Sequence, residues 1–154
     1  MKKIVIIGAN DFQNQLILKA KEMGFETHVF AWQDGSIGER TADHFYPVSI
    51  VEIDEILEKC REIKPDAVAT IASDLANITV SKVAAGLGLP GNTPECIELS
   101  TNKYAMRSAF LKAGLPTPKF YKVDRVIPEL MEMELPVIVK PTDRSGSRAI
   151  TKIT

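Results

Sequence analysis

Short apolar runs alternate with amphipathic stretches along the first ninety residues of the chain. A continuous apolar run such as KIVIIG (residues 3–8) is typical of a strand covered on both faces, as in a parallel sheet. Between these runs, apolar residues recur every three or four positions, which predicts amphipathic helices. The order of these elements, β-α-β, predicts an α/β fold with an open, mostly parallel sheet. We expect strands within 2–8, 25–32 and 67–72, and helices within 12–23, 50–63 and 74–88.

The pattern changes near residue 90, where a turn-rich stretch indicates a domain boundary. One more helix is expected after this stretch. Ser100 or Thr101 would cap its start, because a side-chain oxygen can accept a hydrogen bond from the first helical N–H groups. Gly114 and Pro116 would end it.

The closing stretch predicts two short strands and the loop between them. The apolar run LPVIV (135–139) reads as a strand that ends at Lys140, and a polar loop separates it from a last short strand, so that a hairpin forms. A short strand over 119–123 and a short helix over 126–134 are expected before it.

Charge is distributed unevenly along the chain. The net charge of −1 argues against a nucleic-acid partner and against an anionic membrane surface. Residues 1–99 hold 9 Lys or Arg and 15 Asp or Glu, a net charge of −6, whereas residues 100–154 hold 10 and 5, a net charge of +5. The basic excess fits either ordinary solvated surface or a site for a small polyanion. The first apolar run is too short for a signal peptide or a transmembrane helix, so we expect a cytoplasmic protein.

No metal site and no catalytic residue are predicted within the chain. Cys60 and Cys96 stand far apart with no second ligand beside either, which excludes a C-x-x-C site. His28 and His44 have no matching Asp, Ser or Cys constellation. His28 falls inside an expected strand, where a structural role explains it best.

Two candidate residues follow expected strands of the first domain. Gly8 follows the first strand, but the segment GANDFQ (8–13) has one glycine of the three that a dinucleotide-binding G-x-G-x-x-G turn needs. Gly8 is therefore expected to make a tight turn only. Asp74 stands where the strand at 67–72 gives way to a helix. It fits either a helix N-cap or a substrate contact beyond the carboxyl end of the sheet.

The basic closing part offers two sets of candidate anion ligands. Lys103 and Arg107 are four residues apart and share one face of the expected helix, where an anion would relieve their repulsion. Lys140 ends an apolar strand, and the loop 142–148 after it supplies hydroxyl groups, backbone N–H groups and two guanidinium groups. Gly146 lets the backbone approach a ligand closely. The alternatives are solvated charges and a flexible hairpin connection.

Four stretches occur in a specific order and spacing: VIIGAN, TIASDLA, GLPGNTPECIELSTNKYAMRSAFLKAGLPTPKF and PVIVKPTDRSGSRAI. Together they resemble the front of the ATP-grasp enzymes, and in particular the proteins similar to the carbamoyl-phosphate synthase large chain. The resemblance implies that residues 1–98 form a Rossmann-like pre-ATP-grasp domain. It also implies that residues 99–154 begin an α+β ATP-grasp domain that is incomplete here.

The resemblance assigns roles to single residues. Lys103 matches the lysine that reaches the nucleotide phosphates, and Arg107 matches the arginine one turn later. Lys140 matches the nucleotide-binding lysine before the lid loop, and Asp74 matches a position that lines the acceptor side. The residues of the lid loop that would cover ATP are Ser145, Gly146, Ser147 and Arg148. Two positions depart from the family pattern: Asn102 stands where many relatives have Asp, and Ala149 where Gly is usual.

The activity implied is that of an ATP-dependent ligase, which joins a small-molecule carboxylate to an amine or ammonia through an acyl phosphate. ATP and Mg²⁺ are the implied cofactors, with the metal ligands expected outside this chain. We therefore expect an N-terminal fragment that is inactive by itself, and a homodimer is compatible with the resemblance. The alternative is a non-catalytic nucleotide-binding or interaction module.

Overall fold

The computed structural model of the protein describes residues 1–125, 128–143, 146 and 149–154. It consists of two compact units, residues 1–97 and residues 98–154, which are described separately. Among the described residues, no helix is both long and apolar enough to cross a membrane.

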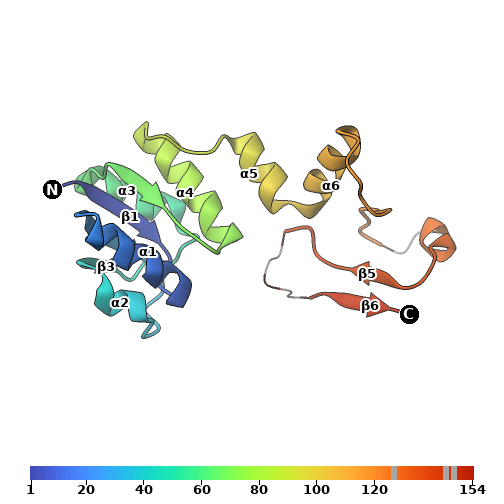
Figure 1. Ribbon diagram of the computed structural model, residues 1–154, viewed down its shortest axis with the longest axis horizontal. Coiled ribbons are helices and arrows are strands. Elements are labelled where there is room, and N and C mark those ends of the chain that lie inside the picture. The colour runs from blue at the N-terminus through green and yellow to red at the C-terminus, as the bar shows by residue number, and fades with distance from the viewer. Residues whose placement is uncertain (126–127, 144–145, 147–148) are drawn as a thin grey trace. The chain divides into compact units, whose positions relative to one another are not determined.

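The first unit is built on a four-stranded parallel sheet with the strand order β3-β2-β1-β4 (Figure 1). Its strands are β1 (Lys3–Ile7), β2 (Glu26–Phe30), β3 (His44–Tyr46) and β4 (Ala67–Ala69). The open, parallel α/β sheet predicted from the sequence is thus confirmed. Because β1 has β2 on one side and β4 on the other, the chain reverses its direction of travel across the sheet at β1.

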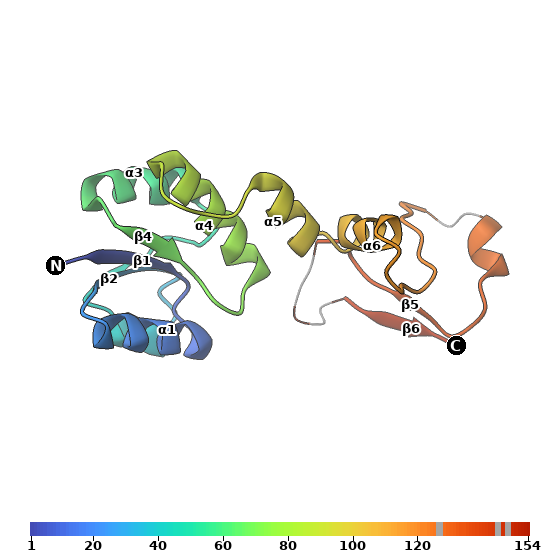
Figure 2. The same cartoon turned by 45° about the horizontal axis from the view of Figure 1, so that its top comes forward.

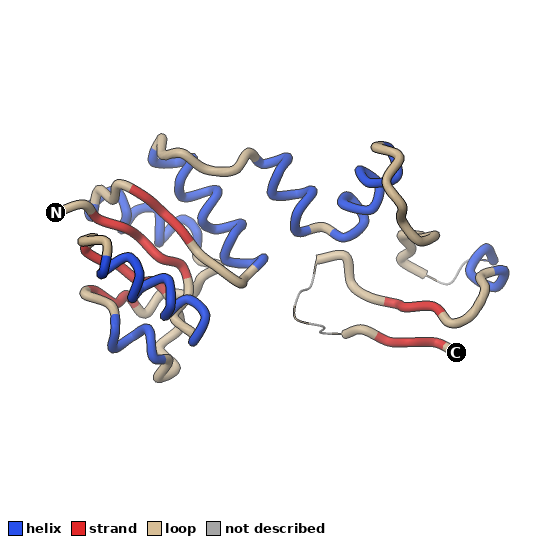
Figure 3. Tube along the Cα trace, viewed as in Figure 1, coloured by secondary structure: helices blue, strands red, loops and turns tan. Residues whose placement is uncertain are grey.

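Helices cover both faces of this sheet (Figure 2). One face carries α1 (Asp11–Glu22), with α2 (Ile37–Thr41) packed against it, and the other face carries α3 (Ile53–Ile63) and α4 (Asp74–Leu87). Figure 3 shows the alternation of strands and helices along the trace. The short elements α2 and β3 were not predicted from the sequence.

The two cores of the first unit are filled from alternate residues of the same strands. On β1, Val5 and Ile7 are fully buried beneath α3 and α4, whereas Ile6 is fully buried on the face covered by α1. Alternation arises because successive side chains of a strand point to opposite faces. An all-apolar strand is therefore what a doubly covered sheet requires, as the sequence indicated.

Backbone contacts fix the turns at the carboxyl ends of the strands. The Gly8 N–H donates to the Phe30 carbonyl at 2.8 Å, and the Gly38 N–H donates to the Ala9 carbonyl at 3.0 Å. Gly8 has a φ of +102°, a conformation that side chains rarely adopt. Its role as a tight-turn glycine was expected.

The second unit contains a helix and a hairpin, joined by a short 3₁₀ helix, Pro128–Glu132. The hairpin pairs β5 (Val137–Val139) with β6 (Thr151–Ile153) in antiparallel fashion, with Val137 opposite Ile153. The predicted hairpin is confirmed. The helix is α6 (Lys103–Lys112), and it is preceded by α5 (Pro94–Thr101), which spans the division between the units.

Two local predictions for this region were wrong, and the helix α5 within the turn-rich stretch was not predicted. The helix α6 is capped by Asn102, not by Ser100 or Thr101, because the Asn102 Oδ1 accepts from the N–H groups of Tyr104 and Ala105 at 3.0 and 3.1 Å. Residues 119–123 form no strand. Instead Phe120 packs edge-on against Tyr104.

Candidate functional site

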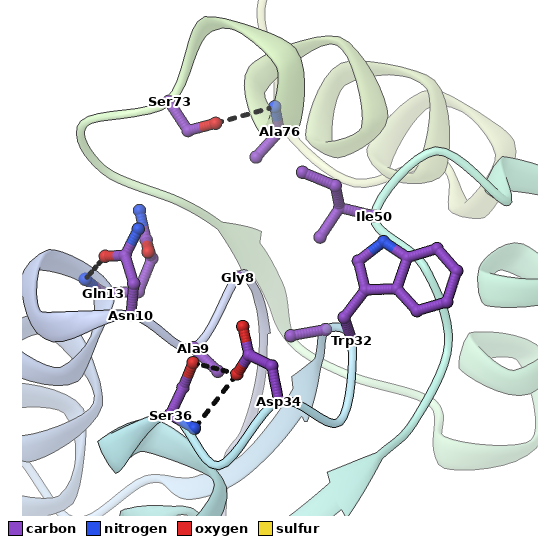
Figure 4. A pocket seen from close by; sticks show the side chains of 11 residues that line it. Gly8, Ala9, Asn10, Gln13, Trp32, Asp34, Ser36, Ile50, Ser73 and Ala76 are labelled. Carbon is purple, nitrogen blue, oxygen red and sulfur yellow. Dashed lines mark hydrogen bonds between the residues drawn. The ribbon is translucent and has the colours of Figure 1, made fainter. Parts of the chain in front are cut away.

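A cavity of about 160 Å³ lies at the carboxyl ends of the strands of the first unit (Figure 4). The loops after β1, β2 and β4 converge there, at the position where the chain reverses direction in the sheet. Ligands of open α/β sheets bind at this kind of position. Its wall is formed by Gly8, Ala9, Asn10, Gln13, Ala31, Trp32, Asp34, Ser36, Ile50, Ser73 and Ala76.

Polar side chains on two sides of the cavity are held by hydrogen bonds. Gln13 is 1% exposed, and its side-chain amide donates to the Ile71 carbonyl. The Asn10 Oδ1 accepts from the Phe12 N–H at 2.9 Å, which caps α1. Trp32 is 68% exposed and offers an aromatic surface at the mouth. The cavity therefore combines fixed amides with an accessible ring.

A carboxylate at the cavity wall is kept ionised. The Asp34 Oδ1 accepts hydrogen bonds from the hydroxyl and the N–H of Ser36. These bonds lower the pKa of the Asp34 carboxyl below its usual value, the hydroxyl having the larger effect. At neutral pH this wall is negatively charged, so a positively charged or hydrogen-bond-donating group would be favoured beside it.

The carboxylate of Glu39 holds the loop after β2 closed. One oxygen of Glu39 accepts from the N–H groups of Asp34, Gly35 and Ser36 at 2.8, 2.7 and 3.2 Å. Successive N–H groups that converge on one acceptor form an anion nest. Because Glu39 fills this nest, the loop can hold Asp34 and Trp32 at the cavity without a bound ligand.

The size of the cavity limits what it can hold. At about 160 Å³ it has room for about five water molecules. Ligand pockets for drug-sized molecules begin near 300 Å³. The cavity thus has room for a small polar part of a substrate.

Asp74 follows the cavity residue Ser73 in the sequence, but it does not cap α4. The N-cap of α4 is Ser73, whose hydroxyl accepts from the Ala76 N–H at 3.2 Å. Asp74 is the first residue of α4 and is exposed. A carboxylate in the first turn is favoured by the helix dipole. Its predicted substrate contact remains a prediction.

In the second unit, the start of α6 contacts the segment after β5. The Lys103 N–H donates to the Thr142 carbonyl at 2.9 Å. Thr142 follows Lys140 by two residues, and Lys140 is exposed at the end of β5. The backbone thus brings together two lysine-bearing segments that are separated by more than thirty residues in the sequence.

Arg107 lies one turn after Lys103 on α6, as the helical spacing predicted. Its Nη1 donates to the Thr117 hydroxyl at 3.2 Å, which ties the loop after α6 to the helix. A guanidinium group has five N–H donors, so this single bond leaves donors for an anion.

The lid loop is described in part. Gly146 is exposed and has a φ of +67°, a conformation in which glycine is favoured. Ser145, Ser147 and Arg148 lie outside the described residues. Ala149, which stands where the family has glycine, has a φ of +55°.

Sequence reasoning missed the cavity residues after β2. Trp32 stands at the end of the strand expected within 25–32, and Asp34 and Ser36 stand in a stretch for which no element was predicted. Their position directly after the second parallel strand could have indicated a binding site, because ligands of such sheets bind beyond the carboxyl ends of strands. It also missed a cluster of two histidines and a glutamate on β2 and β3, for which the alternation E-x-H along an expected strand was the signal.

No family model matches the chain. Four relatives match part or nearly all of the chain, among them the following two. An uncharacterized protein, y4rH, from Sinorhizobium fredii is 36% identical over 85 residues, which are 53% of this chain and 18% of that protein. The formate-dependent phosphoribosylglycinamide formyltransferase of Prochlorococcus marinus is 22% identical over 152 residues, 96% of this chain and 39% of that enzyme.

Solved structures match almost the whole chain. Phosphoribosylglycinamide synthetase from Anaerococcus prevotii has a TM-score of 0.73 and 27% identity, over 98% of this chain and 38% of that one. L-amino acid ligase from Bacillus licheniformis has a TM-score of 0.82 and 22% identity, over 99% and 39%. The biotin carboxylase domain of Hydrogenobacter thermophilus 2-oxoglutarate carboxylase, in complex with MgADP and bicarbonate, has a TM-score of 0.79 and 21% identity, over 98% and 37%.

These structural neighbours are ATP-grasp ligases, and the chain spans about two fifths of their length. The last two likenesses show the shared fold. The predicted fold class, a Rossmann-like sheet followed by the start of an α+β portion, is therefore confirmed. The resemblance to the ATP-grasp superfamily is supported, and the carbamoyl-phosphate synthase-like subtype remains a prediction.

Proposed function

We propose that this chain is the front part of an ATP-dependent ligase, in which it supplies part of the binding site for the ATP phosphates. One observation carries the proposal: the hydrogen bond from the Lys103 N–H to the Thr142 carbonyl, which joins the start of α6 to the segment after Lys140. The predicted phosphate ligands stand on these two segments. The likeness to ATP-grasp ligases supports the same assignment.

The donor set suits a polyphosphate. Lys103 and Lys140 would neutralise phosphate oxygens, Arg107 would add guanidinium N–H donors, and residues 145–148 would cover the phosphates. Fixed donors that face the charge developing on a transferring phosphoryl group are the main source of catalysis in phosphoryl transfer. The basic excess of residues 100–154 favours the same anion.

Magnesium would need ligands from elsewhere. Mg²⁺ binds carboxylate, phosphate and water oxygens, and it neutralises phosphate charge when it is bound. In the part of the chain that the structure describes, the one cluster of three metal-binding side chains contains two imidazoles, which do not suit Mg²⁺. The Mg²⁺ ligands are proposed to lie outside these 154 residues.

The reaction proposed for the intact protein has two steps. The γ-phosphoryl group of ATP is transferred to an oxygen of the carboxylate substrate, and ADP leaves. The nitrogen of an amine or of ammonia then attacks the carbonyl carbon, and phosphate leaves. A carbamoyl-phosphate synthase-like substrate, bicarbonate, is the most specific form of this proposal. The fragment by itself is proposed to be inactive.

The cavity of the first unit is proposed to take part of the acceptor substrate. Its volume fits a small polar group, and the ionised Asp34 favours a nitrogen that carries hydrogen or positive charge. Asp74 would contribute a second carboxylate near this edge of the sheet. The first unit is also proposed to form a homodimer, as the related biotin carboxylase domain does.

The gene and its product test this proposal together. We expect the reading frame to continue beyond codon 154 into a segment with a Glu/Asn metal pair. With a carboxylate substrate labelled with ¹⁸O, the encoded protein should release ADP and move one ¹⁸O atom into phosphate when an amine is supplied. Phosphate without the label would contradict the acyl phosphate. A genuine stop at codon 154 would favour a non-catalytic nucleotide-binding or interaction module.

A further inference from the structure

Two histidines and a glutamate meet on one face of the sheet in the first unit. Glu26 and His28 are two residues apart on β2, so their side chains point to the same face. The parallel ladder places His44 of β3 directly opposite His28. All three therefore lie on the face that α3 and α4 cover, toward the amino end of β2 and away from the cavity at the carboxyl ends.

The nitrogen and oxygen atoms of these side chains converge. The Glu26 Oε1 lies 2.9 Å from the His44 Nε2 and 3.2 Å from the His28 Nε2. One ligand atom from each of the three residues can be chosen so that all lie within 4.8 Å of one another. The two imidazole rings are stacked, with centroids 4.5 Å apart and an angle of 16° between their planes.

The two ring nitrogens of His28 have different surroundings. Its Nδ1 lies 3.0 Å from the Tyr46 hydroxyl, whereas its Nε2 is buried and has no hydrogen-bond partner. It lies 3.2 Å from the Glu26 Oε1, which makes an ion pair only if His28 is protonated. A buried polar atom without a partner requires an explanation. An ion held by Nε2 would supply one.

We propose that Glu26, His28 and His44 bind a divalent transition-metal ion of the Zn²⁺ type. In a tetrahedral Zn²⁺ site, ligand atoms at about 2.0–2.1 Å from the metal stand about 3.3 Å apart. The two Glu–His distances are already near this value. Because a metal lies in the plane of each imidazole that binds it, the half-exposed His44 ring would turn out of its stack on His28 to complete the set. Tyr46 would fix the tautomer of His28 by accepting from its Nδ1–H, as outer ligands of metal-bound histidines do.

The site would keep one coordination position open to water. The side chain of His44 is 49% exposed and that of Glu26 is 23% exposed, so an ion can enter from the solvent. Three protein ligands, two histidines and one glutamate, are a set that Zn²⁺ accepts with a water molecule in the fourth position.

Neighbouring cations are engaged elsewhere. Lys3 pairs with Glu26 in the ladder, but its Nζ donates to the Ile63 carbonyl at 3.1 Å. Lys59, on the α3 helix near Tyr46, forms an ion pair with Glu62 at 2.7 Å. The cluster shares no residue with the proposed phosphate ligands, so the two proposals can fail separately.

The experiment is a calorimetric titration of Zn²⁺ into the tag-free 154-residue chain, which contains two histidines in all. We expect one ion per chain. His44→Ala should weaken binding by about tenfold or more, and Tyr46→Phe by up to about tenfold, through loss of the outer hydrogen bond. Because His44 is exposed, its variant should stay folded, which circular dichroism can check. Binding unchanged by His44→Ala would overturn the proposal.

Two matched variants exclude other sites. Cys96 is an exposed free thiol that could hold Zn²⁺ by itself, so Cys96→Ser must leave the affinity unchanged. Glu58→Gln removes an exposed carboxylate of α3 outside the cluster, and it should bind like the unmodified chain, whereas Glu26→Gln should not. With Co²⁺, both imidazoles should show paramagnetic shifts in NMR spectra. Loss of binding in Cys96→Ser, or shifts of neither imidazole, would overturn the proposal.

Discussion

The contact between α2 and the turn after β1 gives a sharp stability prediction. A Cβ added at Gly38 would lie 2.6 Å from the Ala9 carbonyl oxygen and 2.9 Å from the Ala9 Cα. These are backbone atoms of the turn at the cavity wall, and the adjacent N–H of Gly8 is bonded to Phe30. The turn therefore cannot move without disturbing the end of the sheet.

Gly86 provides a matched control on another helix. A Cβ there would lie 2.8 Å from a methyl carbon of Leu57, the end of a flexible side chain. Overpacking costs about 1–3 kcal/mol, and alanine gains up to about 1 kcal/mol over glycine inside a helix. We expect Gly38→Ala to lower the free energy of unfolding by about 1–2 kcal/mol and Gly86→Ala to change it by about 0.5 kcal/mol or less.

Urea unfolding followed by circular dichroism measures this difference. With a urea m-value of about 2 kcal/mol/M, Gly38→Ala should lower the midpoint by about 0.5–1 M. Equal midpoints for the two variants would refute the reasoning, because it depends on the difference between a backbone obstacle and a side-chain obstacle.

Three further predictions concern single groups. Burial raises the pKa of the Cys60 thiol to about 12. A thiol reagent at pH 8 should therefore modify only the exposed Cys96 in the native chain. Rapid reaction of both thiols would contradict the burial of Cys60. Hydrogen bonding, above all from Lys21, lowers the pKa of Asp43 from 3.8 to about 2, so its stabilisation is present above pH 4 and is lost as the pH falls toward 2. Asp43→Asn should therefore lower the free energy of unfolding by about 1 kcal/mol at pH 7, after allowance for solvent screening, and a loss that persists at pH 2 would contradict this origin. Ala149 has a φ of +55°, so Ala149→Gly should slow hydrogen exchange in the β5–β6 hairpin, and faster exchange would count against strain there.

The strongly patterned elements could be predicted from the sequence. β1 is apolar on both faces, and α3 repeats its buried positions Ile56, Cys60 and Ile63 at helical spacing. The pattern of β1 arises because both faces of the strand are buried, and that of α3 arises because one face of the helix is buried. The parallel sheet followed because such strands alternate with helices.

Shorter elements gave too little signal. β3 has three residues and α2 has five, fewer than are needed to show a period. The stretch KFYKV contains the aromatic and β-branched residues that are typical of a strand, yet Lys122 and Phe120 contact Tyr104 of α6 instead of a neighbouring strand. In these segments tertiary contacts decide the conformation, and the local sequence does not contain them.

The candidate sites depended on contacts between distant residues. Lys103 and Thr142 meet through a backbone hydrogen bond that no spacing rule could predict, although the order of the family-like stretches indicated both segments. His28 and His44 meet because the ladder pairs β2 with β3 across α2. That register is set by packing, so the cluster was missed.

Binding of MgADP to the 154-residue chain, followed by NMR, tests the proposed phosphate-binding site most directly. We expect weak, millimolar binding that shifts the amide signals of Lys103, Thr142 and Gly146 together. Lys140→Ala should reduce this response, and Lys112→Ala, which removes the same charge from the far end of α6, should leave it intact. The same response in both variants, or no shift at Lys103 and Thr142, would contradict the account.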